Sequence, residues 1–191
     1  LAPNAVDSGS TTLTLPAPLT AAMYYVIAVA DGNGDVPETA ESNNALARAV
    51  AIGGDLVVTA LTVPASGAPA STITVSDTTA NQGAGLAAES QTRFYLSTNF
   101  TLDAGDTLLS GARAVVPLAG GANSTGTSSV TLPADLSAGT YYLIARADAD
   151  QTVVETTETN NTFSRTIQIG GDLVVSAFTV PAKGGAGQPL I

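Results

Sequence analysis

The chain has 191 residues, a formal net charge of −10, and no histidine, cysteine or tryptophan. Histidine and cysteine are among the commonest catalytic nucleophiles, general bases and zinc ligands. Their absence argues against most sites of these kinds. The acidic charge argues against nucleic acid, because phosphate binding depends on lysine and arginine. With 45% hydrophobic and only 12% charged residues, the composition is typical of a folded protein rather than a disordered acidic tail. No apolar run approaches the roughly 20 residues that a membrane-spanning helix needs.

The sequence contains an internal repeat with an offset of 117 residues. GGDLVVTALTVPA begins at Gly53, and GGDLVVSAFTVPA begins at Gly170. The same offset aligns residues 1–74 with residues 118–191 without a gap, and about half of the aligned positions are identical. A period of this length is typical of whole-domain repeats rather than of a solenoid.

The repeat predicts the domain organisation. Residues 1–53 are expected to be the C-terminal part of one repeat, residues 54–170 a complete repeat, and residues 171–191 the first strand of a following repeat. We interpret the chain as a window on a longer tandem array. The partners of a repeat are then its neighbours in the same protein, with lateral or end-to-end self-assembly as an extension. Completion of the partial repeats by a strand of a neighbouring chain is the open alternative.

Within the complete repeat, hydrophobic residues alternate with a period of two, which indicates β-strands. Proline, glycine, asparagine and aspartate separate these segments. Seven short strands without a convincing helix favour an all-β fold of immunoglobulin-like antiparallel sandwich domains. The predicted strands span residues 55–64, 71–79, 90–98, 107–117, 125–133, 139–148 and 162–169.

Two tyrosines stand at the start of equivalent strands. Tyr141 opens the strand predicted at 139–148, on the same face as Leu143 and Ala145, and Tyr24 occupies the equivalent position upstream. Sandwiches often place a tyrosine here, with its hydroxyl bonded to the preceding loop. We predict this structural role for both residues.

The opposite face of that strand is apolar where a simple sandwich would meet water. Tyr142 and Ile144 lie on it, and Arg93 and Tyr95 join them if the strand at 90–98 pairs alongside. One interpretation is an ordinary exposed strand covered by arginine stems. The other is a lateral interaction face for a second domain or chain.

The stretch DADQTVVETTETNNT, from Asp148 to Thr162, gathers carboxylates between the last two predicted strands, and DGNGDVPETAESNNA repeats it upstream. Calcium takes roughly six to eight oxygen ligands, many of them carboxylates. Asp148, Asp150, Glu155 and Glu158 are therefore candidate calcium ligands. The alternative is a solvated hairpin tip, in which Asp and Asn form the turn and the glutamates discourage strand-to-strand aggregation.

A second acidic segment, NFTLDAGD, runs from Asn99 to Asp106 and is expected at the opposite end of the sandwich. Asp103 and Asp106 are its candidate calcium ligands. An ion shared with acidic groups across a Gly-Gly-Asp junction would stiffen an array, whereas the two glycines by themselves indicate a flexible hinge. Calcium is the one cofactor that the sequence suggests.

Four motifs occur in an order that resembles one family. They are the GGDLVV opening strand with its VPA ending, TRFYLSTN with LDAGDTLL, GTYYLIARAD, and the ETTETNN hairpin. Together they resemble the CARDB domain, a cell-adhesion-related domain of bacterial and archaeal surface proteins. The resemblance implies an immunoglobulin-like sandwich used as a tandem module in large secreted or surface-anchored proteins. It implies no ligand, because it describes architecture more than activity.

We predict a non-enzymatic structural or adhesive repeat of a prokaryotic extracellular or cell-surface protein, in a stalk or fibre. One alternative is a module that binds carbohydrate or protein through loops 80–85 and 148–161. Binding loops should diverge between repeats, whereas ETAESNN and ETTETNN are similar, which favours the structural role. The other alternative is a spacer domain of a secreted enzyme.

Overall fold

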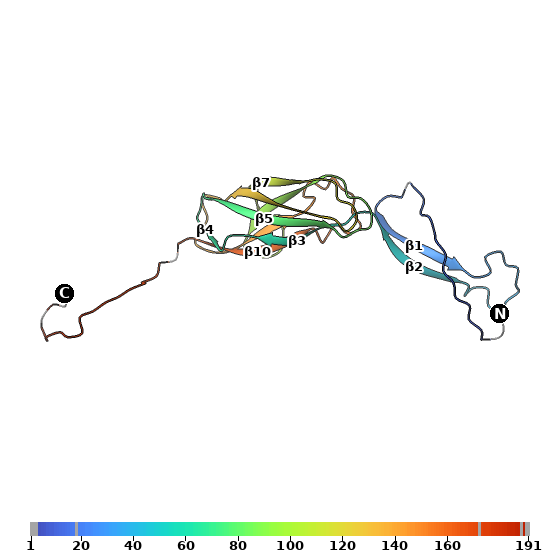
Figure 1. The fold of residues 1–191 in the computed structure, drawn as a ribbon, viewed down its shortest axis with the longest axis horizontal. Coiled ribbons are helices and arrows are strands. Elements are labelled where there is room, and N and C mark those ends of the chain that lie inside the picture. The colour runs from blue at the N-terminus through green and yellow to red at the C-terminus, as the bar shows by residue number, and fades with distance from the viewer. Residues whose placement is uncertain (1–3, 18, 172, 188, 190–191) are drawn as a thin grey trace.

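The computed structural model describes residues 4–17, 19–171, 173–187 and 189, and these form strands and loops without a helix (Figure 1). Accordingly, this part of the chain holds no helix able to cross a membrane. The strands are β1 (Ala22–Val29), β2 (Ala45–Ile52), β3 (Leu56–Thr62), β4 (Ser66–Gly67), β5 (Thr72–Asn81), β6 (Ser90–Ser97), β7 (Thr107–Val115), β8 (Asn123–Thr131), β9 (Gly139–Arg146) and β10 (Thr162–Ile169).

Strands β3 to β10 form a sandwich of two sheets. The larger sheet has the order β4-β10-β9-β6-β7, and the smaller sheet has the order β3-β5-β8. Neighbouring strands are antiparallel except for the short parallel pair of β4 and β10. The predicted all-β sandwich is therefore confirmed for this part of the chain.

Alternation along the strands creates one core between the sheets. In β5, every second residue from Ile73 to Asn81 is buried, and in β9 Leu143 and Ala145 are buried on the inner face. One cluster of buried side chains draws on both sheets, with Phe94 among its largest members. Full burial of such a side chain contributes about 1.5–3 kcal/mol. The core therefore holds the two sheets face to face.

Each of the seven strands predicted for the complete repeat overlaps a strand of the sandwich. The prediction missed β4, which lies in the segment VPASGAP and pairs only two residues with β10. Proline and glycine hide such a short edge strand, because they interrupt the alternation on which the prediction depends.

The β1–β2 hairpin is a separate two-stranded sheet that repeats the β9–β10 pair. All eight Cα pairs of the hairpin recur in the same register 117 residues later. The Tyr24 hydroxyl donates to the Thr20 carbonyl at 3.2 Å, and the Tyr141 hydroxyl donates to the Ser137 carbonyl at 3.2 Å. The predicted role of both tyrosines is confirmed.

After β10 the chain leaves the sandwich as an extended segment (Figure 1). Its described residues, 171, 173–187 and 189, form no strand, although the sequence predicts one here. The equivalent strand, β3, obtains its hydrogen-bonded ladder from β5. A strand needs a partner for its N–H and C=O groups. The described part of this segment pairs with no other strand, and side chains such as Leu173 and Phe178 are exposed.

Candidate functional site

The acidic loop (residues 148–161) packs against the start of β3. The Thr156 N–H donates to the Gly54 carbonyl at 3.0 Å, and the Asn160 Nδ2 donates to the Asp55 carboxylate at 3.0 Å. The acidic loop therefore connects the last hairpin of the sandwich to its first strand through hydrogen bonds. The sequence predicted a calcium site or a solvated tip for this loop.

Asp148 builds the turn at the beginning of the acidic loop. Its backbone has a φ of 40°, which aspartate tolerates better than most residues. Its carboxylate is buried and accepts hydrogen bonds from the Thr152 N–H at 3.1 Å, the Thr152 hydroxyl at 3.0 Å and the Val153 N–H at 3.0 Å. All of these donors are local, so the side chain serves the fold of its own loop.

Glu155 connects the acidic loop to β3. Its buried carboxylate accepts a hydrogen bond from the Leu56 N–H at 2.7 Å and another from the Asn161 side-chain amide. Burial raises the pKa of the Glu155 carboxyl from 4.5 to about 7; both hydrogen bonds oppose the rise, and the nearby Glu158 and Asp148 carboxylates add to it. The prediction of a solvated edge is therefore wrong at Glu155.

The Asn81 side chain connects several chain segments at the same end of the sandwich. The sequence prediction did not include this role. Its Oδ1 accepts hydrogen bonds from the Asp55 N–H and the Gly83 N–H, both at 3.0 Å. Its Nδ2 donates to the carbonyls of Gly85 at 2.7 Å and Leu118 at 2.8 Å. One buried side chain thus organises three chain segments. The available signal was the inward parity of Asn81 at the end of β5.

The candidate calcium ligands do not converge. In the second acidic segment, Asp103 accepts the Gly105 N–H at 2.8 Å, and Asp106 accepts the Asp103 N–H at 2.8 Å. In the acidic loop, Asp150 pairs with Arg93 at 2.9 Å, and Glu158 accepts the Glu155 N–H at 3.0 Å. Across the described residues, no three His, Cys, Asp or Glu side chains gather as a metal site. The donor set therefore does not fit a bound metal ion.

We expect millimolar calcium to leave the thermal unfolding midpoint of the full chain unchanged relative to a chelator. The carboxylates already accept hydrogen bonds from the backbone or pair with arginine, so binding would have to break these contacts. An ion at ten times its dissociation constant would add about 1.4 kcal/mol and raise the midpoint by a few degrees. Calorimetry with magnesium as the control measures this, and a calcium-specific rise would contradict the expectation.

The middle of the second acidic segment extends towards the acidic loop. A shallow pocket is lined by Thr101, Leu102, Arg146, Glu158, Thr159, Asn161 and Thr162. Ser97, just before the second segment, pairs with Tyr142, four residues and about 13 Å along β9 from Arg146. Thr101 and Leu102 therefore reach over the outer face of the larger sheet towards the acidic loop. Asp103 and Asp106, in contrast, line a second pocket with Leu136 and Tyr141 at the opposite end of β9, where the sequence predicts this segment.

This path over the sheet changes the predicted interaction face of Arg93, Tyr95, Tyr142 and Ile144. β6 does pair with β9, and Tyr95 lies opposite Ile144, as predicted. Ile144, however, is 0% exposed although it points away from the core, while its counterpart Ile27 in the hairpin is 60% exposed. Ile144 is therefore covered by its own domain and is not available for a partner. Arg93, Tyr95 and Tyr142 remain half-buried.

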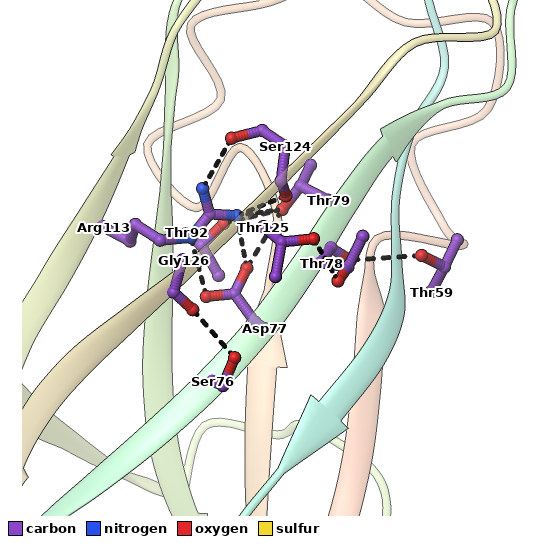
Figure 2. Close-up of polar contacts among 10 residues, drawn as sticks. All are labelled: Thr59, Ser76, Asp77, Thr78, Thr79, Thr92, Arg113, Ser124, Thr125 and Gly126. Carbon is purple, nitrogen blue, oxygen red and sulfur yellow. Dashed lines mark hydrogen bonds and ion pairs between the residues drawn. The ribbon is translucent and has the colours of Figure 1, made fainter.

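A buried ion pair, absent from the sequence prediction, joins the two sheets (Figure 2). The Arg113 guanidinium on β7 forms two hydrogen bonds with the Asp77 carboxylate on β5, and Nε to Oδ1 measures 2.8 Å. The guanidinium also donates to the hydroxyls of Thr79 at 3.1 Å and Ser124 at 3.0 Å. Both charges occupy inward positions of their strands, and this parity is the signal that could have revealed them.

Gly126 on β8 makes room for this pair. A Cβ at Gly126 would stand 2.6 Å from the Cδ of Arg113, which is closer than atoms can approach without displacement. The arginine stem therefore lies directly on the glycine backbone, and the ion pair, β7 and β8 form one packed edge of the sandwich.

The CARDB family model matches residues 53–165 of this chain. The chain is also similar to the CARDB domain of a Pyrococcus furiosus protein in complex with di-metal ions, with 21% identity, coverage of 62% of this chain and 90% of that one, and a TM-score of 0.46. A domain from a Methanosarcina acetivorans protein named as a cell surface protein has 21% identity, coverage of 63% and 96%, and a TM-score of 0.47. A comparison with curated proteins gives no match.

A β-glucosidase from Listeria innocua is similar at 15% identity, with a TM-score of 0.42. The similarity covers 63% of this chain but only 17% of the enzyme. It therefore concerns a small part of that protein.

Proposed function

This chain belongs to the CARDB family, and from that premise we propose that it is a structural and adhesive module of a prokaryotic extracellular or cell-surface protein. The module is one repeat of a tandem array that forms a stalk or fibre. It is not an enzyme, and its partners are neighbouring repeats of the same protein.

The observation that carries this proposal is the repetition of one strand pair in a single chain. The β1–β2 hairpin and the β9–β10 pair have the same register over eight Cα pairs, at an offset of 117 residues. Sequence repetition of whole domains is the usual signature of an array in which each unit contacts its neighbours. Repetition in register supports a tandem role over that of an isolated binding domain.

The use of polar groups at the end of the sandwich also supports a structural role. Asn81, Asp148, Glu155 and Asn161 are buried, and each forms hydrogen bonds to the acidic loop or to the loops around it. A binding loop would present such groups to a ligand. The loops at 80–85 and 148–161 direct them towards the protein itself, so the alternative of a carbohydrate or protein binding module is not favoured.

The proposal predicts that antibodies raised against the folded chain label intact, non-permeabilised cells of the source organism. Immunogold electron microscopy is the measurement, with an antibody to a cytoplasmic protein as the control for lysis. Labelling at several positions along one surface structure is the expected result for an array. Labelling that requires permeabilisation would overturn the extracellular location, and a single label per structure would overturn the tandem stalk.

A further inference from the structure

The two glycines between β2 and β3 are held by contacts on both sides. We propose that Gly53 and Gly54 form a fixed joint between repeats. The loops at the end of the sandwich contact this joint and hold the C-terminal end of the preceding repeat in one orientation. This inference rests on the proposed function, because it takes the β1–β2 hairpin as the end of that repeat. It replaces the flexible hinge that two consecutive glycines suggest.

The preceding side of the joint is a close contact between a glycine and an alanine. Gly53 has a φ of 125°, and a Cβ at this position would stand 2.4 Å from the Cβ of Ala21. The equivalent pair after β10 is alike, since Gly170 has a φ of 110° and its Cβ would stand 2.9 Å from the Cβ of Ala138. Both the backbone conformation and the lack of space require glycine. The contact occurs twice and therefore belongs to the repeat.

The following side of the joint is formed by backbone hydrogen bonds from the sandwich. The Gly85 N–H donates to the Gly53 carbonyl at 2.8 Å, and the Thr156 N–H donates to the Gly54 carbonyl at 3.0 Å. A Cβ at Gly83 would stand 2.4 Å from the Gly53 carbonyl oxygen. Both carbonyls of the joint thus have partners, and the loop lies directly on the joint backbone.

A comparison of the two junctions within the chain shows what the following domain adds. A Cβ at Gly54 would stand 3.0 Å from the Cβ of Ala87, whereas a Cβ at Gly171, the equivalent residue, has no atom within 4 Å. A Cβ at Gly53 would also stand 3.7 Å from the Thr156 Cγ2 of the following domain, whereas a Cβ at Gly170 would meet, among the described residues, atoms of Ala138 on the preceding side. The enclosure at the first junction therefore comes from the sandwich that follows it.

The geometry limits rotation at the joint. A flexible linker has solvated backbone groups and open φ and ψ, whereas here the two carbonyls are bonded and a neighbouring side chain or loop contacts each glycine. Changing the φ of Gly53 would rotate the hairpin, together with Ala21, relative to the Gly53 carbonyl, which the bond from Gly85 fixes to the sandwich. A preceding repeat is thus held in one orientation, and an array built with such joints is stiff.

Spin-label distance measurements on the full chain test the joint, and the chain has no native cysteine to interfere. Labels are attached through Ala49→Cys on β2 and Thr127→Cys on β8, both of which are exposed strand positions. The expected result is a single narrow distance distribution. A broad distribution in this otherwise native chain would overturn the proposal.

Two further variants locate the cause. Gly53→Ala is expected to broaden or displace the distribution, whereas Gly171→Ala, at an open position, is expected to leave it unchanged. If Gly53→Ala does not fold, insertion of two glycines after Gly53 lengthens the linker without adding a Cβ, and it must broaden the distribution. An unchanged distribution after that insertion would overturn the joint. The orientation is measured in solution, so this test can fail while the cell-surface location stands, and the reverse.

Discussion

Replacing Arg113 with methionine will lower the free energy of unfolding by about 3–5 kcal/mol. The change keeps most of the volume of the stem on Gly126 but leaves the Asp77 carboxylate, which is 0% exposed in its side chain, without a counter-charge. Thr79 is the remaining side chain that donates to this carboxylate, at 3.3 Å. A buried charge without a partner is among the most destabilising changes that a single substitution can make.

Chemical denaturation measures this effect, and a double-mutant cycle with Asp77→Ala isolates the interaction between the two charges. We expect the double variant to lose less stability than the sum of the two single variants, because it leaves neither charge unpaired. Arg93→Met is the matched control. Its pair with Asp150 is about one-third exposed at both side chains, at 34% and 35%, so the loss should stay below about 1 kcal/mol. Equal losses at Arg113 and Arg93 would contradict this account.

Between about pH 5.5 and pH 8.5, the free energy of unfolding should fall by about 2 kcal/mol, and Glu155 should cause most of the fall. The pKa of this carboxyl is raised from 4.5 to about 7 in the folded chain. The folded state therefore binds the proton more tightly than the unfolded state does. The resulting stabilisation is fully present below pH 4.5 and is lost as the pH rises through about 7.

The composition of the chain makes this measurement clean, because no histidine or cysteine titrates in the same range. Glu155→Gln keeps the shape of the side chain and should remove most of the pH dependence. Glu38→Gln changes the equivalent residue of the hairpin, which is exposed, and should leave the pH dependence intact. A flat pH profile for the native chain, or a profile that Glu155→Gln does not alter, would contradict the prediction.

The elements that could be predicted are those with a regular pattern. Alternation located all seven longer strands of the sandwich, and the position of Tyr141 at a strand start predicted its bond to the Ser137 carbonyl. Asp77 and Arg113 occupy inward positions of their strands, but the sequence prediction did not include them. Their pairing could not be predicted, because β5 and β7 belong to different sheets. Parity within a strand does not state which inward residues meet across a core.

The candidate site was less predictable than the fold. Carboxylate clusters indicated calcium, but the oxygens of Asp103 and Asp148 accept hydrogen bonds from nearby backbone N–H groups. Local turns and metal sites use the same residue types. The interaction face failed at Ile144 for another reason. The path of the 98–106 segment over the sheet depends on tertiary packing rather than on any local pattern.

The sequence by itself determined the turn of the acidic segment. Asp31 in the hairpin accepts the N–H groups of Asp35 and Val36, and Asp148 in the sandwich accepts those of Thr152 and Val153. The two turns agree although the hairpin and the sandwich differ in their surroundings. The donors lie only four and five residues from each aspartate, so local chain geometry is sufficient.

Only the tertiary structure decided what the following glutamate does. Glu38 and Glu155 occupy equivalent positions, yet Glu38 is exposed and Glu155 is buried against the Leu56 N–H. This donor lies 99 residues away in the sequence. Its arrival depends on the closure of the whole sandwich, which brings the first and last strands together. The same residue is therefore a solvated carboxylate in one copy and a buried group with a raised pKa in the other.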